Sequence, residues 1–101
     1  MNVNVVKNSN QARVNLQGRF DFGSHARFKE ACDHALEAAG VDELVLDMAQ
    51  VEYLDSSALG MLLLLRDRVA QAKKAVAIEN CHGIVREVLG IANFQKLFAI
   101  R

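Results

Sequence analysis

Two segments near the start of the chain alternate between apolar and polar residues. Valines alternate with asparagines over residues 2–5, and a polar turn follows at residues 8–10. After the turn, Ala12, Val14 and Leu16 alternate with polar residues. A period of two predicts β-strands with one buried face. Because the connection is short, the two strands are expected to form an antiparallel hairpin.

Three later segments change to helical periodicity, in which apolar residues recur three or four positions apart. The first begins at Ser24, a good N-cap residue, and is predicted to end at Gly40, which supplies a C-cap. A second helix is predicted from about Ser56 to Ala72, and a third apolar stripe runs from Ile84 to Leu89. After the first hairpin, the periodicity of the chain therefore changes from that of strands to that of helices.

Short apolar runs separate the predicted helices. Leu44–Met48 is nearly unbroken, Val76–Ile78 is shorter, and Leu97–Ile100 closes the chain. Such runs are typical of strands buried on both faces of a parallel sheet. Alternating strands and helices predict an α/β fold with right-handed crossovers. The sheet should be mixed and mostly parallel, with the last four strands parallel and the N-terminal strand added antiparallel.

Three loops are expected to meet at the carboxyl ends of these strands, where α/β proteins place their functional sites. They span Gly18–Ser24, Gln50–Ser57 and Asn80–Gly83. The middle loop ends in three consecutive cap-type residues, Asp55-Ser56-Ser57, although one residue suffices to cap a helix. This surplus favours a functional role, with helix capping alone as the structural alternative.

The helix after this loop has two different faces. At about 100° per residue, an apolar arc should face the sheet, formed by Ala58, Leu62, Leu65, Val69 and Ala72. The opposite side is predicted to expose a stripe formed by Ser57, Gly60, Met61, Leu64 and Arg68. An exposed leucine and methionine near an exposed serine, with a glycine that permits close approach, are better explained as a docking face for a partner than as chance.

Length and composition indicate one globular domain over residues 1–101, since 51% of the residues are hydrophobic and 24% are charged. Twelve basic residues balance twelve acidic ones, so the chain lacks the positive field that non-specific nucleic-acid binding requires. The longest apolar run, Met61–Leu65, is far shorter than a membrane span. The N-terminus lacks the layout of a secretion signal. We therefore expect a cytoplasmic protein that binds neither nucleic acid nor membrane.

The two cysteines, Cys32 and Cys81, form no CxxC pair and are too few for a structural zinc site. Both are expected to be buried free thiols. No metal or cofactor is expected.

The chain resembles the STAS domain family, and within it the bacterial anti-sigma factor antagonists, over nearly its whole length. The resemblance rests on Gly18–Asp21, Leu44–Asp47, Tyr53–Gly60 and a closing pattern from Val85 to Ile100. The Asp-Ser-Ser segment is its most specific element. Two departures concern Ala58, where glycine is commoner, and Cys81-His82-Gly83, where a Ser-Pro pair often opens the last helix.

This resemblance implies a phosphorylation switch. The serine that matches Ser57 is phosphorylated by the partner anti-sigma factor, a serine kinase of the histidine-kinase-like ATPase fold, and dephosphorylated by a PP2C-type phosphatase. Only the unphosphorylated form captures the anti-sigma factor and so releases the sigma factor. Asp21, Asp55 and Ser56 match family positions beside that serine.

Two other functions fit parts of the sequence. A non-phosphorylated STAS scaffold, similar to the small subunits that bind transporter ATPases, would use the same helix face while Ser57 served only as a cap. A small serine hydrolase would combine Ser57 and His82 with Asp21 or Asp55. However, a nucleophile elbow places glycines two residues either side of the serine, where this chain has an aspartate and a leucine. We therefore predict a binding protein that is not an enzyme.

Overall fold

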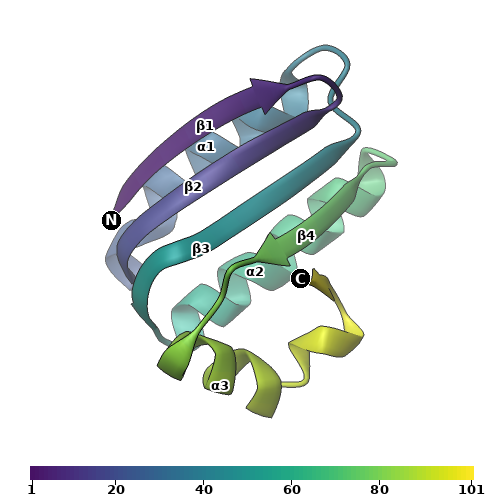
Figure 1. Ribbon diagram of the computed structural model, residues 1–101. Coiled ribbons are helices and arrows are strands. Elements are labelled where there is room, and N and C mark those ends of the chain that lie inside the picture. The colour runs from purple at the N-terminus through teal and green to yellow at the C-terminus, as the bar shows by residue number, and fades with distance from the viewer.

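A single mixed sheet of five strands, in the spatial order β1-β2-β3-β4-β5, forms the centre of the computed structural model, which describes all residues from Met1 to Arg101 (Figure 1). The strands are β1 (Asn2–Asn8), β2 (Gln11–Phe20), β3 (Glu43–Leu54), β4 (Ala75–Glu79) and β5 (Ala99–Ile100). The first two strands pair antiparallel, and all other neighbouring strands pair parallel. The predicted mixed sheet with an antiparallel N-terminal strand is confirmed.

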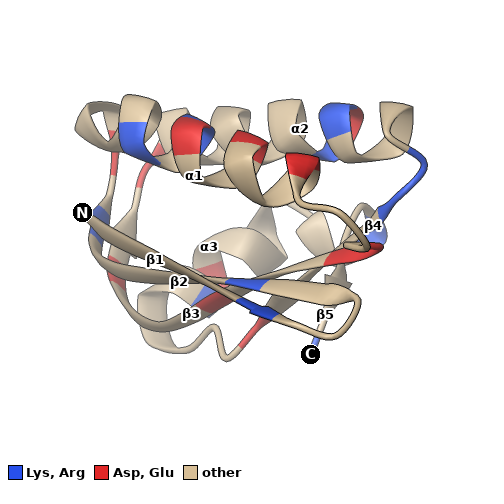
Figure 2. Cartoon of the chain, turned by 90° about the horizontal axis from the view of Figure 1, so that it is seen from above, with Lys and Arg blue, Asp and Glu red and all other residues tan.

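Three α-helices and two short 3-10 helices connect the strands. They are η1 (Phe22–Ser24), α1 (His25–Glu37), α2 (Ser56–Gln71), α3 (Gly83–Ile91) and η2 (Phe94–Lys96). Helices α1 and α2 lie side by side on one face of the sheet, where α1 covers β1 and β2 and α2 covers β3 and β4 (Figure 2). Helix α3 follows β4 at the carboxyl ends of the strands (Figure 1). None of these helices combines the length and apolar character that a membrane crossing needs.

The hydrophobic core fills the space between the sheet and these two helices. Alternate residues of the strands, such as Val14 on β2, Leu46 on β3 and Ile78 on β4, point into it and are fully buried. Leu62 from α2 and Phe28 from α1 meet them from the helix layer. The opposite face of the sheet has no helix layer (Figure 2), and most of the strand residues on it are polar or charged.

Strand β3 is longer than predicted, and this corrects the expected middle loop. The predicted strand ended at Met48, whereas β3 continues to Leu54, so that only Asp55 separates it from α2. Pairing with β2 shifts register twice along this extension, between Asn15 and Gln17 and again between Gly18 and Arg19. These irregularities interrupt the alternation of buried and exposed residues. The sequence of this extension therefore predicts a loop instead of a strand.

Three other element ends differ from the prediction. Helix α1 ends at Glu37, and Gly40 lies beyond its extended C-cap residue in a separate turn with φ of +81°. Ala72, expected in the core, is the exposed C-cap of α2. The final strand loses two residues because the backbone amides of Leu97 and Phe98 both donate to the Phe94 carbonyl of η2. Caps and tight turns, rather than apolar periodicity, set these boundaries.

Both cysteines are buried free thiols, as predicted. Burial raises the pKa of Cys32 to about 12, and the chain fully covers this side chain. We expect Cys32 to react slowly with Ellman's reagent in the native protein and rapidly after unfolding in guanidinium, because the thiolate is the reactive form. The reaction rate of Cys32 is obtained by comparing Cys81→Ser with the double variant that also lacks Cys32. Rapid native-state modification would contradict the register of α1.

Candidate functional site

The carboxyl ends of β2 and β3 bring the predicted site residues together. Asp21 directly follows β2 and Asp55 directly follows β3, and the two strands are parallel neighbours. The backbone amide of Asp55 donates to the Phe20 carbonyl at 3.3 Å, which holds the two chain segments against each other. Two acidic side chains thus flank the start of α2.

The start of α2 is capped by one of its three candidate residues. The Asp55 carboxylate accepts a hydrogen bond from the backbone amide of Ala58 at 3.0 Å, and Asp55 has the extended backbone of an N-cap. The hydroxyls of Ser56 and Ser57 make no hydrogen bond within the chain; Ser56 is exposed and Ser57 half-buried. Since the cap needs neither serine, both hydroxyls are free for another role.

Asp21 is held in place by the short helix η1. The buried Ser24 hydroxyl donates to the Arg19 carbonyl at 3.0 Å and accepts from the Asp21 amide at 3.3 Å. The Asp21 carboxylate lies 3.7 Å from Nε of Arg19, whose guanidinium stacks 4.2 Å above the centre of the Tyr53 ring. Sequence reasoning missed Arg19 and Tyr53 as site residues, because they become cross-strand neighbours only through the register shift between β2 and β3.

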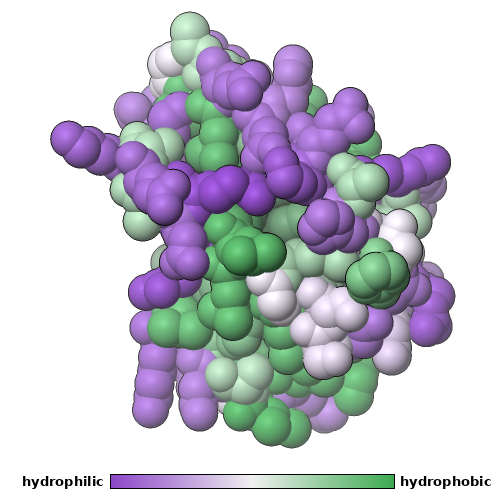
Figure 3. All heavy atoms as spheres, turned by 180° about the vertical axis from the view of Figure 1, so that it is seen from behind, coloured by the Kyte–Doolittle hydropathy of each residue, from purple (hydrophilic) through white to green (hydrophobic).

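The predicted exposed stripe on α2 is correct for Gly60 and Leu64. Leu64 is 56% exposed, and a Cβ added at Gly60 would meet no atom within 4 Å. On the helix-covered side of the molecule, green apolar side chains reach the surface among pale and purple ones (Figure 3). Leu63, 39% exposed, adds to the apolar surface of α2. A helical wheel places Leu63 in neither the apolar arc nor the exposed stripe.

The expectation that Met61 and Arg68 are exposed is wrong. Met61 is only 6% exposed, and Arg68 is half-buried with its Nε 3.1 Å from the Asp33 carboxylate. The cause is the neighbouring helix α1, which covers this flank of α2. Both residues line a groove of about 50 Å³ between the two helices, together with His25, Phe28, Lys29 and Leu64.

One strongly apolar residue at this rim escaped the sequence analysis. Phe22, on η1 next to Asp21, is 76% exposed. A phenylalanine so exposed beside a polar cluster suits an interface in which aromatic anchors are buried by a partner. A lone apolar residue in a predicted loop gives no periodic signal, which is why the sequence analysis missed it.

The loop at residues 80–83 does not place His82 in contact with Ser57. The backbone of His82 forms the N-cap of α3, and its ring Nε2 lies 2.8 Å from the Ala49 carbonyl. No hydrogen bond joins Ser57, His82 and either aspartate, so the arrangement of a hydrolytic triad is not formed. No group of three or more His, Cys, Asp or Glu side chains could hold a metal ion.

Comparisons with known proteins agree on one family. Residues 3–99 match the family described as Mlab, STAS domain. A STAS-domain containing protein of Pseudomonas aeruginosa (strain UCBPP-PA14) is 45% identical over 87 residues, which span 86% of this chain and 84% of that protein.

Solved structures share the fold at lower identity. A putative anti-sigma factor antagonist from Thermotoga maritima superposes with a TM-score of 0.86 at 17% identity, covering 97% of this chain and 84% of that one. The Bacillus anti-sigma factor antagonist SpoIIAA in its unphosphorylated form gives 0.75 at 15% identity, over 99% and 87% of the two chains. These likenesses show the fold that the two proteins share with this chain.

Proposed function

This chain belongs to the STAS domain family, and we propose that within it the protein is an anti-sigma factor antagonist whose binding is switched off by phosphorylation of Ser57. The observation that carries the proposal is the start of α2, where Asp55 alone caps the helix and leaves the Ser57 hydroxyl unbonded and partly accessible. Two of the family's structural relatives are described as anti-sigma factor antagonists or putative ones.

The proposed partner is an anti-sigma factor that is also a serine kinase of the histidine-kinase-like ATPase fold. It would bind at the rim and along the exposed side of α2, where Asp21, Asp55, Ser56, Gly60 and Leu64 are accessible or partly accessible. Met61 and Arg68 would contribute through the groove wall between α1 and α2. A PP2C-type phosphatase would restore the free serine, and the cycle would run in the cytoplasm, where sigma factors act.

Phosphorylation can block this binding without changing the fold. A phosphate adds about −1.5 to −2 charge at pH 7. At the first turn of α2 it is favoured by the helix dipole and by amides that have no helical partner. The domain therefore tolerates the group. A partner surface that fits a neutral hydroxyl between Asp21 and Asp55 would meet a cluster of negative charge instead, and would lose affinity through repulsion and desolvation.

Incubation with the cognate kinase and radiolabelled ATP should place phosphate on Ser57 and not on Ser56. Ser57→Ala should abolish labelling, while Ser56→Ala, the matched control one residue away, should keep it. Ser57→Asp should unfold at an unchanged temperature, yet bind the kinase at least about tenfold more weakly in a calorimetric titration. Ser57→Ala should bind and resist regulation. Label that persists in Ser57→Ala would contradict the assignment of the phosphorylation site to Ser57.

The same experiment separates the switch from its two rivals. A STAS scaffold that binds a transporter ATPase would use Ser57 only as a cap, but Asp55 already fills that place. It would dock normally, incorporate no phosphate and be indifferent to Ser57→Asp. A serine hydrolase would turn over a simple ester and lose that turnover in Ser57→Ala. Co-purification of the native protein, followed by identification of its partner, would name the kinase.

A further inference from the structure

The sheet has one long edge that nothing covers. Strand β1 pairs with β2 on one side only, in a continuous register from Asn2 to Asn8. The opposite edge strand, β5, has two residues. Natural edge strands are protected from pairing by proline, bulges or charges. Here the register has no bulge, the chain contains no proline, and the single charged residue, Lys7, donates to the Ala39 carbonyl.

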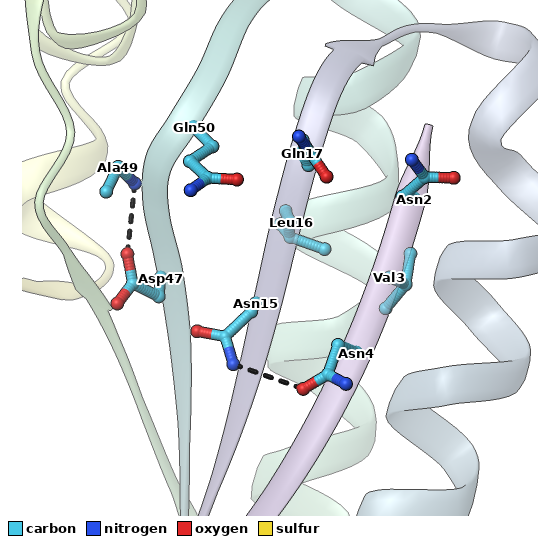
Figure 4. Close-up of a pocket in the computed structure, with 9 residues that line it drawn as sticks. All are labelled: Asn2, Val3, Asn4, Asn15, Leu16, Gln17, Asp47, Ala49 and Gln50. Carbon is cyan, nitrogen blue, oxygen red and sulfur yellow. Dashed lines mark hydrogen bonds between the residues drawn. The ribbon is translucent and has the colours of Figure 1, made fainter.

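A groove on the helix side gives the side chains of an added strand room beside this edge. On the helix side, Val3 and α1 enclose a groove of about 490 Å³, lined also by Arg27, Glu30, Ala31 and His34. On the open side, a cavity of about 280 Å³ begins at Asn2 and Asn4 and extends over the polar side chains of β2 and β3 (Figure 4). Every second residue of an added strand would place its side chain beside the helix-side groove, and the residues between them would lie beside Asn2 and Asn4 on the open side.

We propose that β1 pairs antiparallel with β1 of a second copy of this chain, about a two-fold axis at Asn4, joining the two sheets into one. In this register, Val3 of one copy lies opposite Val5 of the other on the helix side. On the open side Asn4 faces its own counterpart, and a carboxamide can both donate to and accept from another. Similar side chains therefore meet on both faces of the edge.

The charges at the edge favour a second copy over a charged peptide. The groove beside Val3 carries one cation, Arg27, and one anion, Glu30, so that the flank is neutral and does not repel its own copy. In the proposed register Lys7 lies opposite Met1, whose amino group is also a cation, but the Lys7 ammonium donates to the Ala39 carbonyl of its own chain, and the two lysines are far apart. An isologous interface needs a surface that is complementary to itself, and this strand and flank meet that condition.

Such a dimer would leave the candidate site free. Helix α1 packs on β1 and β2, while α2 packs on β3 and β4. The rim and the exposed side of α2 therefore face away from the shared edge, and the dimer would present two partner surfaces. The pairing does not depend on the phosphorylation switch, and Ser57→Asp should leave the mass in solution unchanged.

Site-specific cross-linking tests the register. Residues directly opposite in an antiparallel pair have Cβ atoms about 4.5–5.5 Å apart, close to the separation in a disulfide. Mild oxidation should convert Asn4→Cys into a covalent dimer on a non-reducing gel. Asn2→Cys is the matched control, because in this register the two copies of residue 2 are about 13 Å apart. Both positions are exposed, and the native cysteines are buried. Equal cross-linking at both positions would overturn the register.

Sedimentation of the unchanged chain provides the second measurement. We expect twice the monomer mass of 11.2 kDa when the chain concentration is about 100 μM. A dimer that forms at this concentration has the affinity of a weak interface. Asn4→Lys brings two ammonium groups together at the axis and should give the monomer, while Asn2→Lys, opposite Val6, should remain dimeric. A wild-type chain that is monomeric at this concentration would refute the proposal. The edge would then be left to an extended peptide from another protein.

Discussion

Replacing Leu62 with alanine is expected to lower the free energy of unfolding by about 2 to 5 kcal/mol, the usual cost of a large-to-small change in a core. Leu62 lies on α2, is fully buried, and belongs to the cluster that joins the helix layer to the sheet. Truncation removes its contacts and leaves a cavity that the surrounding strands can only partly close. Thermal and urea unfolding followed by circular dichroism measure the loss.

Leu64→Ala is the matched control on the same helix. The two leucines are about 160° apart around α2, and Leu64 is 56% exposed where Leu62 is fully buried. Its truncation should change stability by less than about 0.5 kcal/mol, as surface substitutions usually do. Under the proposed function it should nevertheless weaken binding of the anti-sigma factor, because a few apolar anchors carry most of the affinity of an interface.

The pair of variants distinguishes three cases. A Leu64→Ala protein as unstable as Leu62→Ala would show that α2 is rotated from the orientation described. A stable Leu64→Ala protein with unchanged affinity would make Leu64 an incidental surface leucine and move the docking face elsewhere. Normal stability with reduced affinity is the expected outcome.

The fold could be predicted from the sequence because its periodicities are local and regular. The hairpin, the three helices and the parallel orientation of the later strands follow from apolar spacing and from the alternation of strands and helices. The extension of β3 to Leu54 could not, since the register shifts that allow it depend on pairing with β2. A bulge breaks the alternation that identifies a strand. The sequence therefore predicts a loop where the strand in fact continues to Leu54.

The candidate site divides in the same way. Asp55, Ser56 and Ser57 stand out because three cap-type residues in a row exceed what a helix start needs. A helical wheel separates the side facing the sheet from the other side, but it contains no information about a second helix. This is why Met61 and Arg68, which α1 covers, were wrongly expected to be exposed. Contacts between distant segments are visible only in the assembled fold.

The open face of the sheet contains a network of ion pairs that joins three strands and the residue after β5. Arg13 on β2 contacts Asp47 on β3 at 2.7 Å and Glu79 on β4 at 2.8 Å. Arg101, which follows β5, contacts Glu79 and Glu43, both at 2.8 Å. The side chains of Asp47 and Glu79 are mostly covered. Removal of a shared cation would therefore leave poorly solvated carboxylates without their main partner.

The pKa values of both carboxylates reflect this network. Burial alone would raise the pKa of Asp47, but hydrogen bonds from the Ala49 amide, Asn80 and Arg13 outweigh it and the pKa is lowered. Hydrogen bonds from Arg13 and Arg101 lower the pKa of Glu79. A carboxylate with a lowered native pKa stabilises the fold above its unfolded pKa, about 4. This stabilisation is lost as the pH falls through the native pKa.

Arg13→Ala should therefore lower the free energy of unfolding by about 1.5 to 3 kcal/mol at pH 7, because two charge-assisted hydrogen bonds disappear and two partly buried carboxylates remain. The difference from the wild type should shrink as the pH falls below the unfolded pKa of about 4, because the unfolded state then binds protons that the ion-paired native carboxylates still resist. Urea unfolding at pH 7, 5 and 3.5 measures this. Arg86→Ala is the control, since Arg86 is exposed and makes no ion pair, and it should match the wild type at each pH. A loss in Arg13→Ala that stays constant from pH 7 to 3.5 would assign the role of Arg13 to packing of its aliphatic stem rather than to the ion pairs.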